Sequence, residues 1–100
     1  MLVRKDLPHP HQVVQACHAS LEAARSFLSP HEEHPSVIVC GLPDESALRR
    51  SHARISQSGI RCSAFHEPDL EGQLTALATE PVFREQRRLF RNYRLLGQSS

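Results

Sequence analysis

Short runs rich in apolar residues alternate with longer stretches of helical spacing along the chain. Four such runs predict β-strands at residues 2–5, 36–40, 60–65 and 74–79, since each is bounded by proline, glycine or polar residues. The run at 36–40 is almost continuously apolar, which is typical of a strand buried on both faces.

The intervening stretches predict three helices. The first runs from about Gln12 to Leu28 and follows a turn in which two prolines flank His9 and precede His11. The second starts after Asp44, a good N-cap residue, and ends near Ser58-Gly59. The third covers about residues 82–93.

The first helix carries one apolar stripe, which we expect to face the core. A polar line through Gln15, His18 and Glu22 runs beside it. We interpret His18 as a structural histidine bonded to backbone, and the three cysteines as small buried residues. The stripe positions are Val14, Cys17, Leu21, Ala24 and Leu28.

The element order β-α-β-α-β-β-α predicts a single α/β domain over residues 1–96, with one sheet covered by helices on both faces. The strands at 60–65 and 74–79 are joined by a loop too short for a helical crossover, so we expect them to be antiparallel or non-adjacent. Residues 97–100 are expected to form a fraying tail.

The composition is that of an ordinary soluble domain, with 39% apolar and 23% charged residues. No apolar run approaches the roughly 20 residues of a membrane span, and the first residues lack the apolar core of a secretory signal, so we predict a cytoplasmic protein. Three cysteines without a C-x-x-C pair, and seven histidines without an H-E-x-x-H motif, lead us to predict no metal site.

Charge is spread unevenly although the net charge is only +1. Residues 81–100 hold five arginines and one glutamate, hence +4, whereas residues 1–80 hold seven basic and ten acidic side chains, hence −3. The basic face of the third helix is either a solvated surface or a surface that contacts phosphates. Its arginines are Arg84, Arg87, Arg88, Arg91 and Arg94.

Several polar residues fall where a strand passes into a helix or a loop. His11 and Gln12 occupy the N-terminal end of the first helix, where unpaired backbone N–H groups favour an anion such as phosphate. If the strands at 2–5 and 74–79 are neighbours, Gln15 and Thr75 line one pocket with the acidic loop at 66–73.

In a functional interpretation of that pocket, a carboxylate or His11 activates water while Gln15 and Thr75 orient a carbonyl group. The carboxylates in question are Glu67 and Asp69. The plain alternative is a capped helix, a solvated acidic loop and a threonine that faces the core.

Four motifs give the chain a resemblance to a known family. They are R-K-D-L at residues 4–7, Q-A-C-H-A at 15–19, P-D-E at 43–45 and R-L-L at 94–96. With this order and spacing, residues 2–96 resemble the type 2 peptidyl-tRNA hydrolase family, and most closely its divergent peptidyl-tRNA hydrolase domain-containing branch.

The resemblance implies a four-stranded mixed sheet, a frequently dimeric protein, and metal-independent hydrolysis of the ester that joins a peptide to the terminal ribose of tRNA. No cofactor is implied. The family site combines a lysine before the first helix, a glutamine one turn later, an aspartate and a threonine in the loop before the last strand, and a threonine opening that strand. Gln15 and Thr75 match the glutamine and the last threonine.

The chain departs from the family pattern at two places. His11 stands where the lysine is expected, and H-E-P-D-L-E-G-Q replaces the family's D-A-G-R-T motif. The resemblance then implies Glu67 or Asp69 as the base that activates water, and His11 as the contact to phosphate or to the oxyanion.

The same resemblance makes tRNA the expected partner, with Gln15 and Thr75 positioning the ester and with a homodimer as the expected assembly. The residues expected to hold the tRNA backbone are Arg84, Arg87, Arg88 and Arg91. The alternative is a catalytically inactive module on the same fold that binds RNA or protein. A small-molecule binder that uses the same cleft is a third hypothesis.

Overall fold

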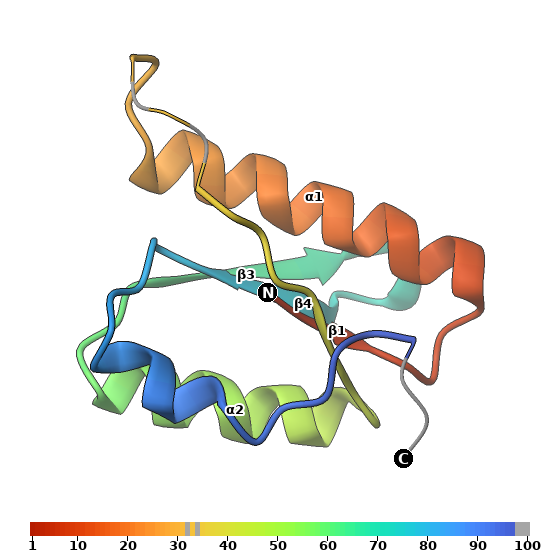
Figure 1. Cartoon of the computed structure of the whole chain (residues 1–100). Coiled ribbons are helices and arrows are strands. Elements are labelled where there is room, and N and C mark those ends of the chain that lie inside the picture. Colours follow the sequence, from red (N-terminus) through yellow and green to blue (C-terminus); the bar gives the residue numbers. More distant parts are fainter. Residues whose placement is uncertain (32, 34, 98–100) are drawn as a thin grey trace.

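The computed structural model of the chain describes residues 1–31, 33 and 35–97. It has three layers, with helix α1 (His9–Phe27) on one face of a sheet and helix α2 (Glu45–Gln57) on the other (Figure 1). The prediction of one sheet covered on both faces is therefore confirmed.

The sheet has four strands in the order β2-β1-β4-β3. β1 pairs parallel with β2 and antiparallel with β4, and β3 pairs antiparallel with β4, so the sheet is mixed, as predicted. The strand bounds are Leu2–Arg4 for β1, Cys40–Leu42 for β2, Cys62–Glu67 for β3 and Gln73–Thr79 for β4.

The core has two halves of different character. Between α2 and the sheet it is made of large side chains, whereas between α1 and the sheet it is made mainly of alanine and valine. The largest fully buried residues on the α2 side are Leu2, Leu48, Ile55, Leu74 and Leu77. On the α1 side the buried residues are Val3, Ala19, Ala76 and Ala78.

The predicted apolar stripe of α1 faces away from the sheet, so that prediction is wrong. Leu21 is 69% exposed, Val14, Cys17 and Ala24 are also exposed, and Leu28 is half-buried. The sheet beneath α1 offers small side chains, and α1 packs on it through its own small residues together with two glutamines. The prediction that the three cysteines are buried is correct for Cys40 and wrong for Cys17, which lies on the exposed stripe. Cys62 is half-buried.

α1 begins at His9, three residues earlier than predicted. Pro8 is its N-cap residue and Pro10 lies in the first turn, where the missing N–H of proline removes no helical hydrogen bond. His11 is therefore a helical residue and not part of the preceding turn.

β2 starts at Cys40, where the predicted strand at 36–40 ends. β1 offers only three residues for pairing, and the register that joins Leu2 to Cys40 uses all of them. Because the two strands are parallel, the residues before Cys40 lie beyond Leu2, the first residue of β1. Val37 and Ile38 are exposed instead of buried on both faces.

The predicted third helix is only a short 3₁₀ helix over Gln86–Phe90. Arg54 of α2 donates to the carbonyl oxygen of Leu89 at 3.1 Å and to the Tyr93 hydroxyl at 2.5 Å. These contacts hold the segment against α2, while Phe83 remains 75% exposed, so no continuous apolar stripe supports an α-helix there.

The last described residues close the outer edge of the sheet. Leu95 forms an antiparallel bridge with Cys40, and the Leu96 N–H donates to the Val39 carbonyl oxygen at 2.8 Å. This covers the edge of β2, which protects it from pairing with another chain. The end of the predicted tail, residues 98–100, lies outside the described residues.

The buried face of α2 gives a stability prediction. We expect Ile55→Ala to lower the free energy of unfolding by about 2–5 kcal/mol, because the residue is 0% exposed and the substitution leaves a cavity. Urea denaturation followed by circular dichroism measures this loss. Phe83→Ala is the control and should change stability by about 0.5 kcal/mol or less. Equal losses in the two variants would contradict this description of the core.

Candidate functional site

A buried arginine joins the end of β1 to the beginning of β4. Arg4 is 7% exposed, and its Nε and Nη2 donate to the two carboxylate oxygens of Asp6 at 2.9 and 2.8 Å. Its Nη1 donates to Oε1 of Gln73 at 2.8 Å and to the carbonyl oxygen of Leu74 at 3.3 Å. One guanidinium group thus fixes both the turn into α1 and the first residues of β4.

Two carboxylates around this arginine have lowered pKa values. The hydrogen bonds from Arg4 hold the pKa of Asp6 below its usual value. On α2, Glu45 accepts the backbone N–H of Leu74 at 2.8 Å, which is the main cause of its lowered pKa. The sequence alone gave no role to Arg4, although an arginine that ends a strand two residues before an aspartate is a signal that could have found this pair.

The register of β3 and β4 shifts where β4 begins. Phe65 pairs with Ala76 and His66 pairs with Leu74, so Thr75 is an extra residue without a partner on β3. Such a bulge changes the face to which side chains point. Leu74 packs in the α2 half of the core, whereas Thr75 and Ala76 both face α1.

Because of this bulge, the Thr75 hydroxyl meets Gln15 of α1. It donates to Oε1 of Gln15 at 2.6 Å, and the two residues are 0% and 4% exposed. The carbonyl oxygen of Phe65 lies farther from the same hydroxyl, at 3.4 Å, and one hydroxyl has only one proton to donate. β1 and β4 are neighbours, which was the condition for a pocket shared by Gln15 and Thr75, and the two side chains are in contact.

The nitrogen of the Gln15 side-chain amide remains available to donate a hydrogen bond. Within the described part of the chain, Nε2 of Gln15 has no hydrogen-bond partner, and no buried side-chain nitrogen or oxygen is left unpaired. Nε2 must therefore reach solvent. The site offers an amide donor whose orientation is fixed by Thr75 and whose N–H groups can bind a carbonyl or phosphate oxygen.

The neighbouring glutamine has a structural role. Nε2 of Gln12 donates to the carbonyl oxygens of Leu7 at 2.8 Å and Lys5 at 3.2 Å, which closes the turn between β1 and α1. A polar residue can be buried at this position because both bonds compensate for its lost hydration.

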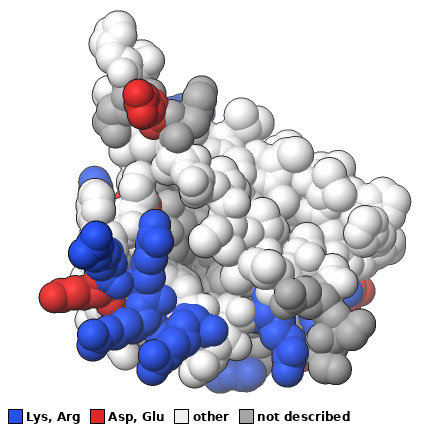
Figure 2. Space-filling view, in the orientation of Figure 1, with Lys and Arg blue, Asp and Glu red and all other residues white. Residues whose placement is uncertain are grey.

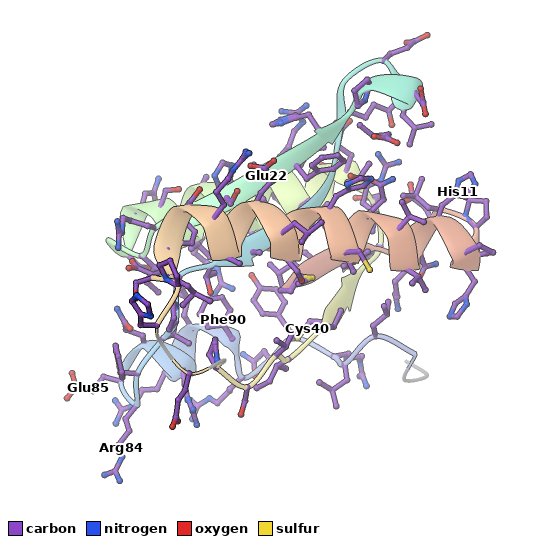
Figure 3. The ribbon with its side chains drawn as sticks, turned by 90° about the horizontal axis from the view of Figure 1, so that it is seen from above. His11, Glu22, Cys40, Arg84, Glu85 and Phe90 are labelled. Atoms are coloured by element: carbon purple, nitrogen blue, oxygen red, sulfur yellow. The ribbon has the colours of Figure 1, made fainter. Side chains whose placement is uncertain are left out.

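His11 lies one turn before Gln15 on α1. Its side chain is exposed near the N-terminal end of this helix, where Figure 3 labels it. The backbone N–H groups of His11 and Gln12 are not unpaired, contrary to the prediction. Both donate to the carbonyl oxygen of Pro8, at 2.9 and 3.1 Å, and Pro10 has no backbone N–H. An anion at this position would be bound by the imidazole and not by the helix backbone.

The two candidate carboxylates differ in position. Glu67 ends β3 and, two residues after Phe65, lies on the α1 face of the sheet. Asp69 is exposed in a 3₁₀ turn over Pro68–Leu70. No hydrogen bond among the described residues joins either carboxylate to Gln15 or Thr75.

His18 packs flat on Phe65 of β3, with ring centroids 4.6 Å apart and an interplanar angle of 7°. Its imidazole is exposed, and no hydrogen bond to backbone is present within the described residues, which corrects that expectation. The stack fixes α1 against the outer strand of the sheet close to the Gln15–Thr75 pair.

The candidate tRNA-binding arginines lie on the α2 side of the sheet, around the 3₁₀ helix. Figure 2 shows basic side chains gathered there, and Figure 3 places Arg84 and His11 at opposite ends of the molecule. All are exposed, and none forms an ion pair with an acidic residue in the described ranges. They are Arg84, Arg87, Arg88 and Arg91.

Among residues 1–31, 33 and 35–97, no three His, Cys, Asp or Glu side chains are placed to hold a metal ion together. In the same residues, no helix is long and apolar enough to cross a membrane.

Comparison with known protein families gives a match over nearly the whole chain. Residues 1–96 match the sequence model of the family described as peptidyl-tRNA hydrolase PTH2. None of the curated proteins compared with the chain matches it significantly.

The Arg4–Asp6 pair gives a pH prediction. Asp6→Asn should lower stability by about 1 kcal/mol at neutral pH, a modest loss because the Asp6 side chain is 38% exposed and solvent screens the pair. Since the folded-state pKa is lowered, the advantage of wild type exists above the ordinary pKa near 3.8 and disappears as the pH falls through the lower folded-state value.

Urea denaturation from pH 7 down to acid measures this difference. Asp69→Asn serves as the control, because Asp69 is exposed and has no ion pair among the described residues. A stability difference between wild type and Asp6→Asn that does not change with pH would contradict the prediction.

Proposed function

The chain belongs to the peptidyl-tRNA hydrolase PTH2 family, and on that premise we propose that it hydrolyses the ester between a peptide and the 3′-terminal ribose of a tRNA. The observation that carries the proposal is the buried hydrogen bond from Thr75 to Gln15 at 2.6 Å, which orients the Gln15 amide and leaves its Nε2 without a partner among the described residues. These two residues match the family's glutamine and threonine.

In the proposed reaction, Nε2 of Gln15 donates to the carbonyl oxygen of the ester. Negative charge develops on that oxygen as water attacks, and a donor that is already oriented stabilises the charge without reorganisation. Thr75 acts as a positioning residue, because its hydroxyl occupies Oε1 of Gln15 and thereby turns Nε2 toward the substrate.

Glu67 or Asp69 is the proposed base. The carboxylate takes a proton from the attacking water, the bond between the carbonyl carbon and the ribose oxygen breaks, and the ribose oxygen leaves with a proton. Glu67 is the better placed of the two, since it lies on the α1 face that carries Thr75. The exposed His11 imidazole is proposed to contact a phosphate or the oxyanion.

The four exposed arginines Arg84, Arg87, Arg88 and Arg91 are proposed to bind the tRNA backbone through phosphate contacts. Arg84, the first of them, and His11 lie at opposite ends of a molecule whose longest extent is 33 Å (Figure 3). One ligand can touch both only if it is extended along that length, as a nucleic-acid helix is. We further propose that the protein acts in the cytoplasm.

A second function has its own support. Compared with the family pattern, the chain has His11 in place of a lysine and lacks the D-A-G-R-T motif, and neither Glu67 nor Asp69 is hydrogen-bonded to the Gln15–Thr75 pair within the described residues. These features favour a catalytically inactive module that binds RNA or protein through the same fold.

Turnover of a purified N-blocked aminoacyl-tRNA separates the two functions. We expect wild type to release the blocked amino acid, and Gln15→Ala to lower kcat by about 10²–10³, as removal of an oxyanion donor does. Binding of the tRNA should be unchanged. If wild type binds tRNA without turnover above the uncatalysed rate, the binding module is the correct function.

Thr75 provides the matched control for this experiment. Thr75→Ser keeps the hydroxyl and should keep most of the activity, whereas Thr75→Val removes it at nearly the same volume and should lower kcat with little change in KM. Equal activity in both Thr75 variants would exclude the proposed positioning role. Glu67→Gln and Asp69→Asn, compared in the same assay, identify which carboxylate is the base.

The arginine surface gives a prediction about binding. Arg88→Glu together with Arg91→Glu should weaken tRNA binding and reduce the dependence of affinity on salt concentration, by about one unit of slope for each phosphate that the protein no longer neutralises. Titration of fluorescent tRNA at several salt concentrations measures both. Arg25→Glu with Arg50→Glu, two exposed arginines elsewhere, is the charge-matched control. Equal effects of the two double variants would mean that the C-terminal arginines are not a specific contact surface.

A further inference from the structure

Two stacked rings adjoin the Gln15–Thr75 pair on both sides of the contact between α1 and the sheet. On α1, His18 lies one turn after Gln15. On the sheet, Phe65 lies next to the bulge at Thr75, and its carbonyl oxygen is 3.4 Å from the Thr75 hydroxyl. The packing of α1 on the sheet that holds the Gln15 amide in place therefore also holds the stack.

The imidazole of His18 forms the outer ring of this stack. Phe65 covers one face of it, with ring centroids 4.6 Å apart and ring planes 7° from parallel. His18 is nevertheless exposed, whereas Phe65 is half-buried, so the exposed part of the imidazole is its other face and its edges. A planar ring whose inner face is packed and whose outer face meets solvent is a surface on which a further ring can stack.

The plane of the imidazole is set before any ligand binds. Phe65, beneath it, packs against the half of the core that is made of valine and alanine. The stacking contact then fixes how the His18 ring lies on that base. A ligand that stacks on a ring already held in place does not have to order that side chain, which favours binding.

His11, Gln15 and His18 follow one line along α1, between the His11 and Glu22 labels of Figure 3. Their spacing, four residues and then three, places them on one face of a helix. The seven residues from first to last rise about 10.5 Å, a length comparable to that of one nucleotide from its phosphate to its base. In the proposed function His11 contacts a phosphate and Gln15 contacts the ester. The base is the part of the terminal nucleotide that still lacks a contact.

The base suits this position better than the peptide of the same substrate does. Peptide side chains differ from one substrate to the next, so a fixed aromatic surface would contact only some of them. The terminal nucleoside of a tRNA is always adenosine, and its purine is a large planar ring. Proteins recognise single-stranded RNA ends in this manner, because unstacked bases pack on aromatic side chains that include histidine.

We propose that the His18–Phe65 stack binds the terminal base of tRNA, with the adenine ring packed on the outer face of the His18 imidazole. The proposal rests on the proposed function, because the ester held by Gln15 determines where the terminal ribose lies. Stacking of the base is the same before and during the attack of water. It therefore contributes to substrate binding and not to the chemical step.

Two trinucleotides measure what the base contributes. One is C-C-A, the sequence at the 3′ end of tRNA, and the other has the same terminal ribose without its adenine. Wild type should bind the first at least about fivefold more tightly, since stacking of a base on an aromatic side chain supplies that much affinity. NMR titration of the isotope-labelled protein gives both Kd values. The adenine ring protons should also shift upfield, because stacked rings shield them.

Variants of His18 test whether the stack is the source of this difference. His18→Leu removes the aromatic face and should abolish the difference in affinity, whereas His18→Tyr keeps such a face and should preserve the difference. His66→Leu is the matched control, because His66 is also exposed and follows Phe65 on the opposite face of β3. Circular dichroism checks that each variant is folded. Equal affinity of wild type for the two trinucleotides, no binding of either, or a difference that persists in His18→Leu would overturn the proposal.

Turnover of N-blocked aminoacyl-tRNA separates a base-binding role from a structural one. His18→Leu should raise KM at least about fivefold and leave kcat nearly unchanged, because it removes an interaction made equally in the ground state and the transition state. Thr75→Val should show the opposite pattern. A fall in kcat without a rise in KM would mean that the stack only positions Gln15, and this would overturn the proposal.

The base site and the hydrolase activity fail in different ways. Turnover by wild type together with equal affinity for the two trinucleotides would remove the base site and leave the hydrolase. Tighter binding of C-C-A without turnover would keep the base site, as part of a module that binds an RNA end, and would remove the hydrolase.

Discussion

The buried guanidinium of Arg4 is the interaction on which the candidate site depends. A cation at 7% exposure is stable only when its donors are paired, and Arg4 is paired with Asp6 before α1 and with Gln73 and Leu74 at the start of β4. These two segments lie about seventy residues apart in the sequence. By holding them together, the arginine sets where α1 begins relative to β4. This position determines the contact between Gln15 and Thr75.

The sequence predicted the arrangement of the layers, since element order limits the topology, and the family resemblance implied the four-stranded mixed sheet. For β3 and β4 the short loop left two alternatives, antiparallel or non-adjacent strands, and the structure shows an antiparallel pair. The sequence brought Gln15 and Thr75 into one pocket only on the condition that β1 and β4 are neighbours, which they are. It failed for the orientation of α1, because helical spacing identifies an apolar stripe without saying whether the sheet offers room for it. Here alanines line that face of the sheet, and the helix turned its glutamines and small residues inward.

Other errors share a physical cause, which is that the deciding partner lies far away in the sequence. Arg54 holds the C-terminal segment in a short 3₁₀ helix through Tyr93 and the Leu89 carbonyl group, and no local pattern in residues 82–93 indicates this. β2 starts later than its apolar run because, in the parallel register, the residues before Cys40 lie beyond Leu2, the first residue of β1.

The extra residue in β4 means that the site depends on the length of this strand as well as on its residue types. Without the bulge, strict alternation from Leu77 would carry the hydroxyl of Thr75 to the α2 face, away from Gln15. A chain shorter by one residue in this strand could therefore keep the glutamine and the threonine in its sequence and still lose their contact. When relatives are compared, a single-residue gap between Gln73 and Thr79 is thus as informative about the site as a substitution within it.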